Sequence, residues 1–326
     1  MRRLLLTAAT TTAAALTLAG CGTTEPAADS SAKAAEAITL TDYTGAKVEL
    51  DGPATKVVAT EWNEVESLIT LGVDPVGVAD VKGYKTWDTA VPLKNEPKDI
   101  GTRGEPSMDT IAALSPDLIV ASSDLPPAAV KQLREIAPVL GIKSADASDQ
   151  IGQMLDNLDL IAKATGTTDQ AKAARADFEA KVAEGEKALA DAGLAGTEIA
   201  FADGYATSNQ VSVRPYTSGS LIGAVNERIG LKNAWKVKGD ESYGLGTTDV
   251  EGLTDLPDDV RFAYIGNDGD ETSTPFTNEL AKNAVWTSLP FVKAGDVHRL
   301  PDGIWMFGGP ESMEAYIDAV VDALTK

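Results

Sequence analysis

Cysteine and histidine are nearly absent from this chain, in which Cys21 and His298 are the single examples among 326 residues. A lone thiol cannot form an internal disulfide. Zinc and manganese sites built on several imidazoles are excluded too, because only one imidazole exists. His298 lies in a stretch that follows a turn and predicts a strand, so we interpret it as a surface strand residue rather than a ligand.

Basic residues are also scarce relative to acidic ones. Lys and Arg total 28 against 49 for Asp and Glu, which gives a formal net charge of −21 at pH 7. Nucleic acids and anionic lipid surfaces are bound by clustered Lys and Arg, so neither is expected as a partner of the folded part. Two explanations of the negative charge stay open, solubility and attraction of cationic ligands.

A long apolar run occurs at the N-terminus, where residues 4–19 are uncharged and follow Arg2 and Arg3. The run is shorter than the ~20 residues that span a bilayer. A positive start, an apolar stretch and small residues before a cleavage point are typical of a secretory signal. The sequence therefore predicts a signal peptide over 1–20.

Leu18-Ala19-Gly20-Cys21 ends this segment and resembles the lipobox of bacterial lipoproteins. The resemblance implies that Cys21 is lipidated, which explains a lone thiol in an exported protein and removes it from any catalytic cysteine–histidine pair. The alternative is an ordinary signal with a chance cysteine. Residues 21–37 hold no large apolar side chain and predict a flexible spacer. We expect the mature protein on the extracytoplasmic face of the cell membrane, held there by the lipid alone.

Residues 38–147 alternate short apolar runs with helical patterns. This alternation predicts βαβ units and a parallel sheet. The expected strands are 56–60, 75–79, 118–121 and 139–142, and the expected helices are 65–71, 107–114 and 128–136.

A longer helix is expected over 148–166. Ile151, Leu155 and Leu158 recur at helical spacing, a Ser-Asp pair can cap the start, and Gly166 can end the helix.

The second half, 167–326, repeats the alternation of helices and strands seen in the first. The expected elements are helices at 167–192 and 218–229 and strands at 198–201 and 260–265. Thr248 and Glu251 have the spacing of a capping box. We expect an α/β protein of two Rossmann-like lobes with parallel sheets, 38–147 and 167–326, joined by one long bridging helix, 148–166.

Two lobes joined by a single helix resemble the helix-bridged, class III periplasmic substrate-binding proteins of iron-siderophore importers. The local sequence is most similar to the ferric hydroxamate-binding proteins of this class. The stretches that carry the resemblance are VATEW (58–62), LGVDPVGVAD (71–80), YKTW (84–87), DIGTRGEPS (99–107), GLKNAW (230–235), WTSLPFVKAG (286–295) and IWMFG (304–308).

The resemblance implies a monomeric, non-enzymatic protein that captures a ferric siderophore of hydroxamate type and delivers it to the permease of an ABC importer. A siderophore fills the coordination sphere of Fe(III) with its own oxygens, so no cofactor and no metal ligand of the protein is expected. Such a carrier needs a cleft with aromatic walls and a cationic donor. Arginine supplies a fixed fork of N–H donors suited to that task.

Arg103, between two glycines, is implied to bind the hydroxamate oxygens, and a structural salt bridge is the alternative. Arg214 has no counterpart in the family and is a candidate second cation from the other lobe, with Tyr216 beside it. Trp235 and Trp286 are expected to pack helix on sheet. The aromatic residues that the resemblance places near the ligand, each of which is open to a plain core role, are Trp62, Trp87, Trp305, Phe307 and Tyr243.

The sequence departs from the family at two places. The family's pocket tyrosine is replaced near Asp124, so that contact is missing or substituted. The acidic residues with which such proteins dock on their transporter do not align, because Lys131 and Ala224 stand there, with Glu135 and Glu227 close by.

Other functions stay open at this point. The same scaffold carries ferric citrate, catecholate siderophores, haem and corrinoids, although haem is disfavoured because only His298 offers an imidazole. A lipid-anchored hydrolase is disfavoured because the chain has neither a Gly-x-Ser-x-Gly elbow nor a Gly-x-Gly-x-x-Gly fingerprint.

Overall fold

The computed structural model describes residues 36–207 and 210–326. The expected signal peptide, Cys21 and nearly all of the expected spacer therefore lie outside the described residues. Within the described ranges, every helix is too short or too polar to cross a membrane.

The first lobe is built on a five-stranded parallel sheet with the strand order β5-β4-β3-β6-β7. Apart from the exposed edge strand β5, its strands are short and almost wholly apolar, as expected for a parallel sheet buried on both faces. Val57 and Ala59 of β3 face one hydrophobic core and Val58 faces the other. The strands are β3 (Val57–Ala59), β4 (Gly77–Val78), β5 (Lys98–Asp99), β6 (Leu118–Ser122) and β7 (Val139–Ile142), and the helices are α1 (Trp62–Thr70), α2 (Val81–Trp87), α3 (Met108–Leu114) and α4 (Pro127–Leu133).

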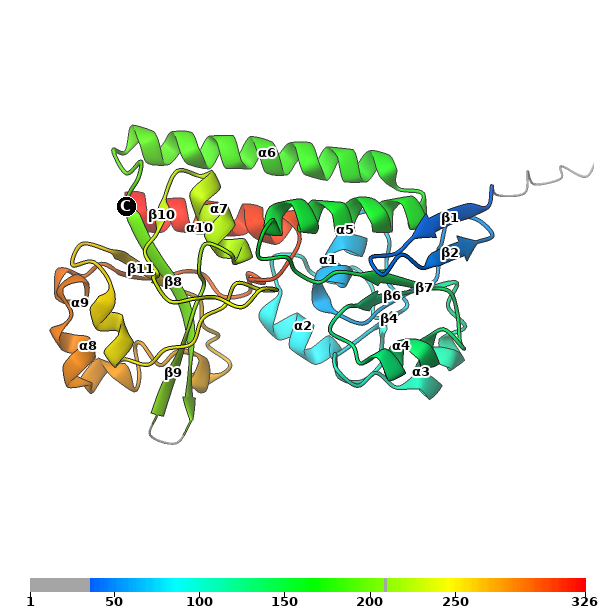
Figure 1. Ribbon diagram of the computed structural model, residues 1–326, viewed down its shortest axis with the longest axis horizontal. Helices are drawn as coiled ribbons and strands as arrows, with labels where there is room; N and C mark the ends of the chain where they lie inside the picture. The colour runs from blue at the N-terminus through cyan, green and yellow to red at the C-terminus, as the bar shows by residue number, and fades with distance from the viewer. Residues whose placement is uncertain (1–35, 208–209) are drawn as a thin grey trace, which may run out of the picture. The chain divides into compact units, whose positions relative to one another are not determined.

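Two antiparallel helices connect the lobes, α5 (Gln150–Thr165) and α6 (Thr168–Asp191). Asp149 caps the start of α5, and Gly166 ends it in the left-handed conformation that glycine tolerates best. The first half of α5 packs in the core of the second lobe and its second half in that of the first, so it bridges them as expected. The helix α6 also contributes to both cores and lies along α5 (Figure 1).

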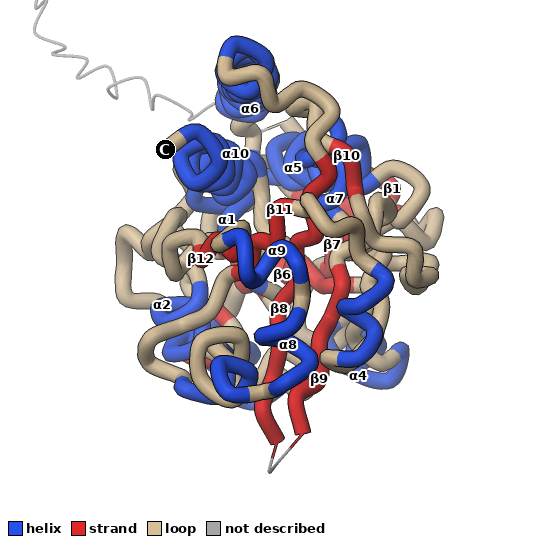
Figure 2. The backbone as a smooth tube through the Cα atoms, turned by 90° about the vertical axis from the view of Figure 1, so that its left-hand side faces the viewer, coloured by secondary structure: helices blue, strands red, loops and turns tan. Residues whose placement is uncertain are grey.

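The second lobe has a sheet of order β10-β8-β11-β12, to which β9 is added by antiparallel pairing with β8. The sheet packs against α7, α10 and the short helices α8 and α9, and α10 lies beside α6 (Figure 2). Its strands are β8 (Glu198–Thr207), β9 (Gln210–Pro215), β10 (Lys232–Asn233), β11 (Arg261–Tyr264) and β12 (Val297–Arg299). Its helices are α7 (Leu221–Arg228), α8 (Ala284–Ser288), α9 (Pro290–Ala294) and α10 (Pro310–Thr325), with 3₁₀ turns η1 (Glu251–Asp255), η2 (Glu271–Ser273) and η3 (Leu280–Lys282).

The α/β class and the long bridging helix are thus confirmed, the first sheet is wholly parallel as expected, and several local expectations need correction. The second sheet is mixed, because β9, a strand that the sequence did not lead us to expect, pairs antiparallel with β8. The hairpin of β1 (Ile38–Thr41) and β2 (Lys47–Leu50) was also missed. The capping box expected at Thr248 does not form: Asp249, not Thr248, accepts the N–H of Gly252 beside η1.

Candidate functional site

A cavity of about 780 Å³ lies between the lobes. Its first-lobe lining follows the carboxyl ends of four neighbouring strands, β3, β4, β5 and β6, where open parallel sheets present ligand sites. The second lobe contributes the β8–β9 hairpin and two loops. The lining residues are Glu61, Trp62, Asn63, Asp80, Trp87, Thr102, Arg103, Gly104, Ser122 and Asp124 from the first lobe, with Tyr205, Arg214, Tyr243, Leu245, Trp305, Met306 and Phe307 from the second half of the chain.

Arg103 lies on the loop after β5, and its guanidinium group is held from two sides. One nitrogen, Nη1, donates to Oε1 of Glu61 over 2.8 Å. The guanidinium carbon lies 4.1 Å from the ring centre of Trp62 and 5.4 Å from that of Trp305, within the range of cation–π attraction. The salt bridge and the ligand-facing position foreseen as alternatives therefore coexist at Arg103.

Glu61 is placed by the start of α1, where a capping box forms with Glu64. The carboxylate of Glu64 accepts the backbone N–H groups of Thr60 and Glu61, and burial followed by the nearby charge of Glu61 raises its pKa. This reciprocal cap fixes the helix start. The Glu61 carboxylate is therefore presented to Arg103 from a rigid position.

Aromatic rings form the floor of the cavity. Trp62 and Trp305 lie 4.6 Å apart between ring centres, and Phe307 follows at 5.2 Å from Trp305 and 5.5 Å from Tyr243. Trp62 is 3% exposed and Trp305 8%, so both are core residues of which only a small part reaches the cavity. Trp62 is the first residue of α1 and Trp87 the last of α2, so both rings are held at helix ends.

Arg214 enters the cavity from the second lobe, on β9. It faces Asp203 of β8 directly across the antiparallel pair, and its guanidinium group contacts both carboxylate oxygens. The hydroxyl of Tyr205 lies 3.0 Å from the same guanidinium group. Neither Asp203 nor Tyr205 was anticipated, although the period-two alternation of Val211 and Val213 on β9 was a signal that could have revealed the hairpin.

Tyr216 lies behind Arg214 rather than in the cavity wall. Its side chain is fully buried, and its hydroxyl donates to Asp203 over 3.2 Å. Burial raises the pKa of Tyr216, which keeps this hydroxyl a donor. The position corrects the expectation that Tyr216 faces the ligand: it supports the pair of Arg214 and Asp203 from within.

Asp124, near which the resemblance leads us to expect a pocket tyrosine, forms a contact between the lobes. Asp124, which follows β6, accepts a hydrogen bond from the hydroxyl of Tyr243 in the second lobe. Burial, followed by this hydrogen bond, raises the pKa of Tyr243. Both side chains line the cavity, so the bond joins its opposite walls.

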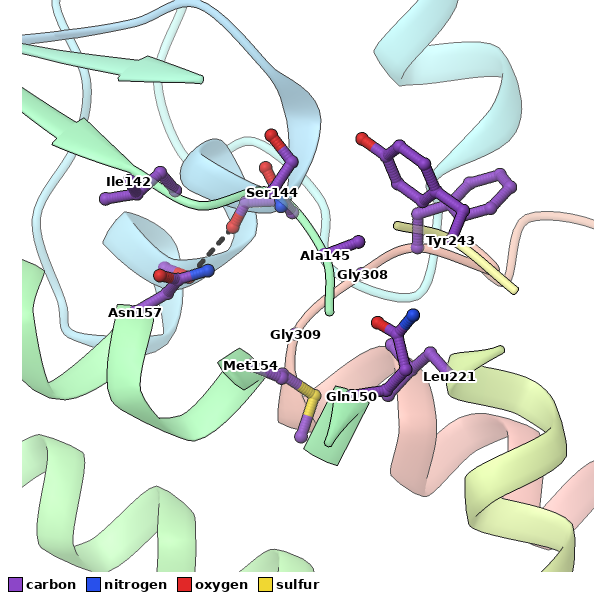
Figure 3. A pocket seen from close by; sticks show the side chains of 13 residues that line it. Ile142, Ser144, Ala145, Gln150, Met154, Asn157, Leu221, Tyr243, Gly308 and Gly309 are labelled. Carbon is purple, nitrogen blue, oxygen red and sulfur yellow. Dashed lines mark hydrogen bonds between the residues drawn. The ribbon is translucent and has the colours of Figure 1, made fainter. Parts of the chain in front are cut away.

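A second, much smaller pocket of about 20 Å³ lies behind Tyr243, where α5 begins (Figure 3). It has room for about one water molecule and is too small for a siderophore. Gln150 at its edge donates to the carbonyl groups of Gly219 and Ser242, which ties α5 to the second lobe. This pocket belongs to the junction of the lobes and not to the ligand site.

The remaining residues singled out in the sequence lie away from the cavity. Trp286 of α8 packs on Phe262 of β11, so its expected role between helix and sheet is confirmed. Trp235 also packs against Phe262 and donates to the carbonyl of Phe201, but it lies in the loop after β10 and not on a helix, which corrects the expectation. His298 is a residue of β12 as expected, though it is partly buried. The residues considered for docking lie on or just after α4 and on α7, where Lys131, Glu135 and Glu227 are exposed and Ala224 is half-buried.

Comparison with known proteins adds three relatives. The probable siderophore-binding lipoprotein YfiY of Bacillus subtilis is 26% identical over 311 residues, which cover 91% of this chain and 90% of that protein. The Fe(3+)-citrate-binding protein YfmC of the same organism is 30% identical, with 82% and 80% covered. The crystal structure of the Fe3+-Desferal-bound siderophore-binding protein FhuD from Vibrio cholerae superposes with a TM-score of 0.70 at 25% identity, and covers 83% of this chain and 98% of that one.

The family match covers most of the folded part. The family described as periplasmic binding protein matches residues 57–303, which run from β3 of the first lobe through the bridging helices to the end of the second sheet. The two-lobed fold with a long helix between parallel sheets is that of the class III proteins in this family. The chain therefore belongs to the periplasmic binding protein family.

Proposed function

We propose that this protein captures a ferric siderophore of hydroxamate type in the interlobe cavity and passes it to an ABC importer. The observation that carries the proposal is the pair of arginines, Arg103 and Arg214, that line one aromatic-floored cavity from opposite lobes. Guanidinium N–H groups suit the partly charged oxygens around a chelated Fe(III), and the rings suit the apolar chelator backbone. Capture is non-covalent, and the iron is cargo held by the siderophore.

The relatives support this proposal at the level of cargo class. One relative is named as a probable siderophore-binding lipoprotein, and the structure of another was solved with Fe3+-Desferal bound. Desferal is a trihydroxamate. Ferric citrate is the second candidate, since YfmC is named for it and is 30% identical. Ferric citrate complexes are anionic. The carboxylates of Glu61 and Asp203, which pair with Arg103 and Arg214, favour the hydroxamate over such an anion.

Tryptophan fluorescence is expected to distinguish the cargoes. Trp62, Trp87 and Trp305 line the cavity, so a bound ferric complex should quench their emission. We expect saturable quenching by ferric trihydroxamates at submicromolar concentration and weaker quenching by ferric citrate, a ferric catecholate and haem. A gallium complex, which lacks the visible absorption of iron, serves as the control for inner-filter effects. Quenching by citrate or a catecholate alone would replace the hydroxamate proposal.

Delivery to an importer requires that the carrier stay near the membrane, and we propose that Cys21 provides this through a lipid. The Cys21→Ser variant of the full chain is expected to appear in the soluble fraction, while its affinity for the cargo is unchanged because the residues that line the cavity, from Glu61 to Phe307, are all retained. Membrane fractionation and fluorescence titration of both forms measure this. Thr23→Ser is the matched control and should remain membrane-bound. A Cys21→Ser protein that stays with the membrane would contradict the anchor.

A further inference from the structure

The cavity contains guanidinium groups but no surplus of positive charge. Arg103 is paired with Glu61, which itself lines the cavity, and Arg214 is paired with both oxygens of Asp203 just behind it. Each arginine therefore presents oriented N–H donors while its charge is balanced by a carboxylate within hydrogen-bond distance. Such donors can bind ligand oxygens without attracting a net anion.

Two further carboxylates line the cavity, those of Asp80 and Asp124. Asp80 accepts the backbone N–H of Gly83, and Asp124 accepts the hydroxyl of Tyr243. Both partners are neutral, and neither carboxylate has a Lys or Arg partner anywhere in the described part of the chain. The lining as a whole thus carries an uncompensated negative charge.

The sheet places these two carboxylates on either side of the aromatic floor. Asp80 follows β4 and Asp124 follows β6, and these strands flank β3, whose carboxyl end leads to Glu61 and Trp62. A ligand in the cavity above the carboxyl end of β3 is therefore bordered by a carboxylate on each side. The net charge of the chain, −21, adds to the same negative potential.

We propose that the cavity selects ferric complexes by the charge of the groups attached to the iron-binding core. Asp80 and Asp124 favour a complex that carries an ammonium group and disfavour one that carries a carboxylate. The proposal rests on the proposed function. Three singly charged hydroxamates neutralise Fe(III), so the pendant group sets the charge of such a complex. Three doubly charged catecholates leave it strongly anionic, which the same lining opposes.

Three probes with one core test this directly. They are the ferric complexes of desferrioxamine B, whose terminal amine is cationic, of its neutral N-acetyl derivative and of its anionic N-succinyl derivative. We expect affinity to fall in that order, with at least a tenfold difference between the first and the last at low salt. In the Asp80→Asn/Asp124→Asn double variant the ratio should fall below about threefold. Asparagine keeps the acceptor oxygen for Gly83 and Tyr243 and tolerates the left-handed backbone of Asp80.

Glu105→Gln is the matched control, since Glu105 is an exposed carboxylate near Arg103 that does not line the cavity. It should leave the ratio unchanged. Equal affinities for the three probes, or a ratio that survives the double substitution, would overturn charge selection while leaving hydroxamate binding intact. Failure of all three complexes to bind, with binding of an anionic ferric catecholate or citrate, would overturn both proposals.

Discussion

Replacement of Arg103 with Ala is expected to weaken the binding of a ferric trihydroxamate by tenfold to about a hundredfold. A hydrogen bond to a charged group contributes about 1.5–3 kcal/mol, and each 1.4 kcal/mol is tenfold in affinity. The substitution also leaves the carboxylate of Glu61 facing the ligand without its cation, which adds repulsion toward the hydroxamate oxygens. Fluorescence titration measures the change.

A purely structural role for Arg103 would lower the melting temperature of Arg103→Ala and leave its affinity unchanged, which we do not expect. The side chain is 36% exposed, and exposed ion pairs contribute about 0–1 kcal/mol to stability, so the melting temperature should change little. Arg103→Lys should recover only part of the affinity, because an ammonium group lacks the planar fork. Arg175→Ala is the matched control: Arg175 pairs with Asp159 at similar exposure, outside the cavity. Unchanged affinity with a lowered melting temperature would make Arg103 a purely structural residue.

Most of the architecture could be predicted from the sequence because buried parallel strands are continuous apolar runs. The run at Leu118–Ser122 forms β6, and the helix expected over 107–114 is α3, with Ser107 as its N-cap. The β8–β9 hairpin was missed because the exposed Tyr205 and the charged, half-buried Arg214 interrupt the apolar pattern of its strands. The capping box at Thr248 failed because η1 is a 3₁₀ turn with different hydrogen-bond spacing.

The site could be predicted only in part. Residues that directly follow a strand, such as Arg103, can be assigned to the carboxyl edge of a sheet from the sequence. Their partners could not, because Glu61 lies 42 residues from Arg103 and Tyr243 lies 119 residues from Asp124. Such pairings depend on how two loops meet across the fold. The charge balance of the cavity is therefore a property of the structure.

The junction between the lobes contains a second group of carboxyls that the ligand site does not use. Glu66 on α1 is fully buried and accepts the backbone N–H of Gly309 over 2.7 Å and the hydroxyl of Ser312 over 2.8 Å, at the start of α10. Asp88 follows α2 and is 1% exposed. Burial, then the neighbouring charge of Asp88, raises the pKa of Glu66, and burial raises the pKa of Asp88 to about 7. The folded state therefore favours the protonated forms of these two carboxyls.

The stability of the protein is expected to fall as pH rises from about 4 to about 8. The folded-state pKa values of Glu66 and Asp88 lie above their unfolded values, so the folded state holds more protons in this window and loses stability as they leave. A shift of Asp88 from 3.8 to about 7 corresponds to at most about 4 kcal/mol. Thermal unfolding at pH 5 and pH 8 measures the difference.

The Asp88→Asn variant separates the contribution of Asp88 to the pH dependence of stability from that of the general repulsion within an acidic chain. An amide at this position cannot ionise and can donate to Glu66, so the variant should gain stability relative to the native chain at pH 8 and gain little at pH 5.

Tyr84 and Glu311 also face the pair, and the charge of Glu311 raises the pKa of Asp88, so Glu311→Gln should reduce the pH dependence slightly. Glu135→Gln, an exposed carboxyl near α4, is the control that should leave it unchanged. An equally steep decline in Asp88→Asn would show that net charge, and not the buried pair, causes the loss.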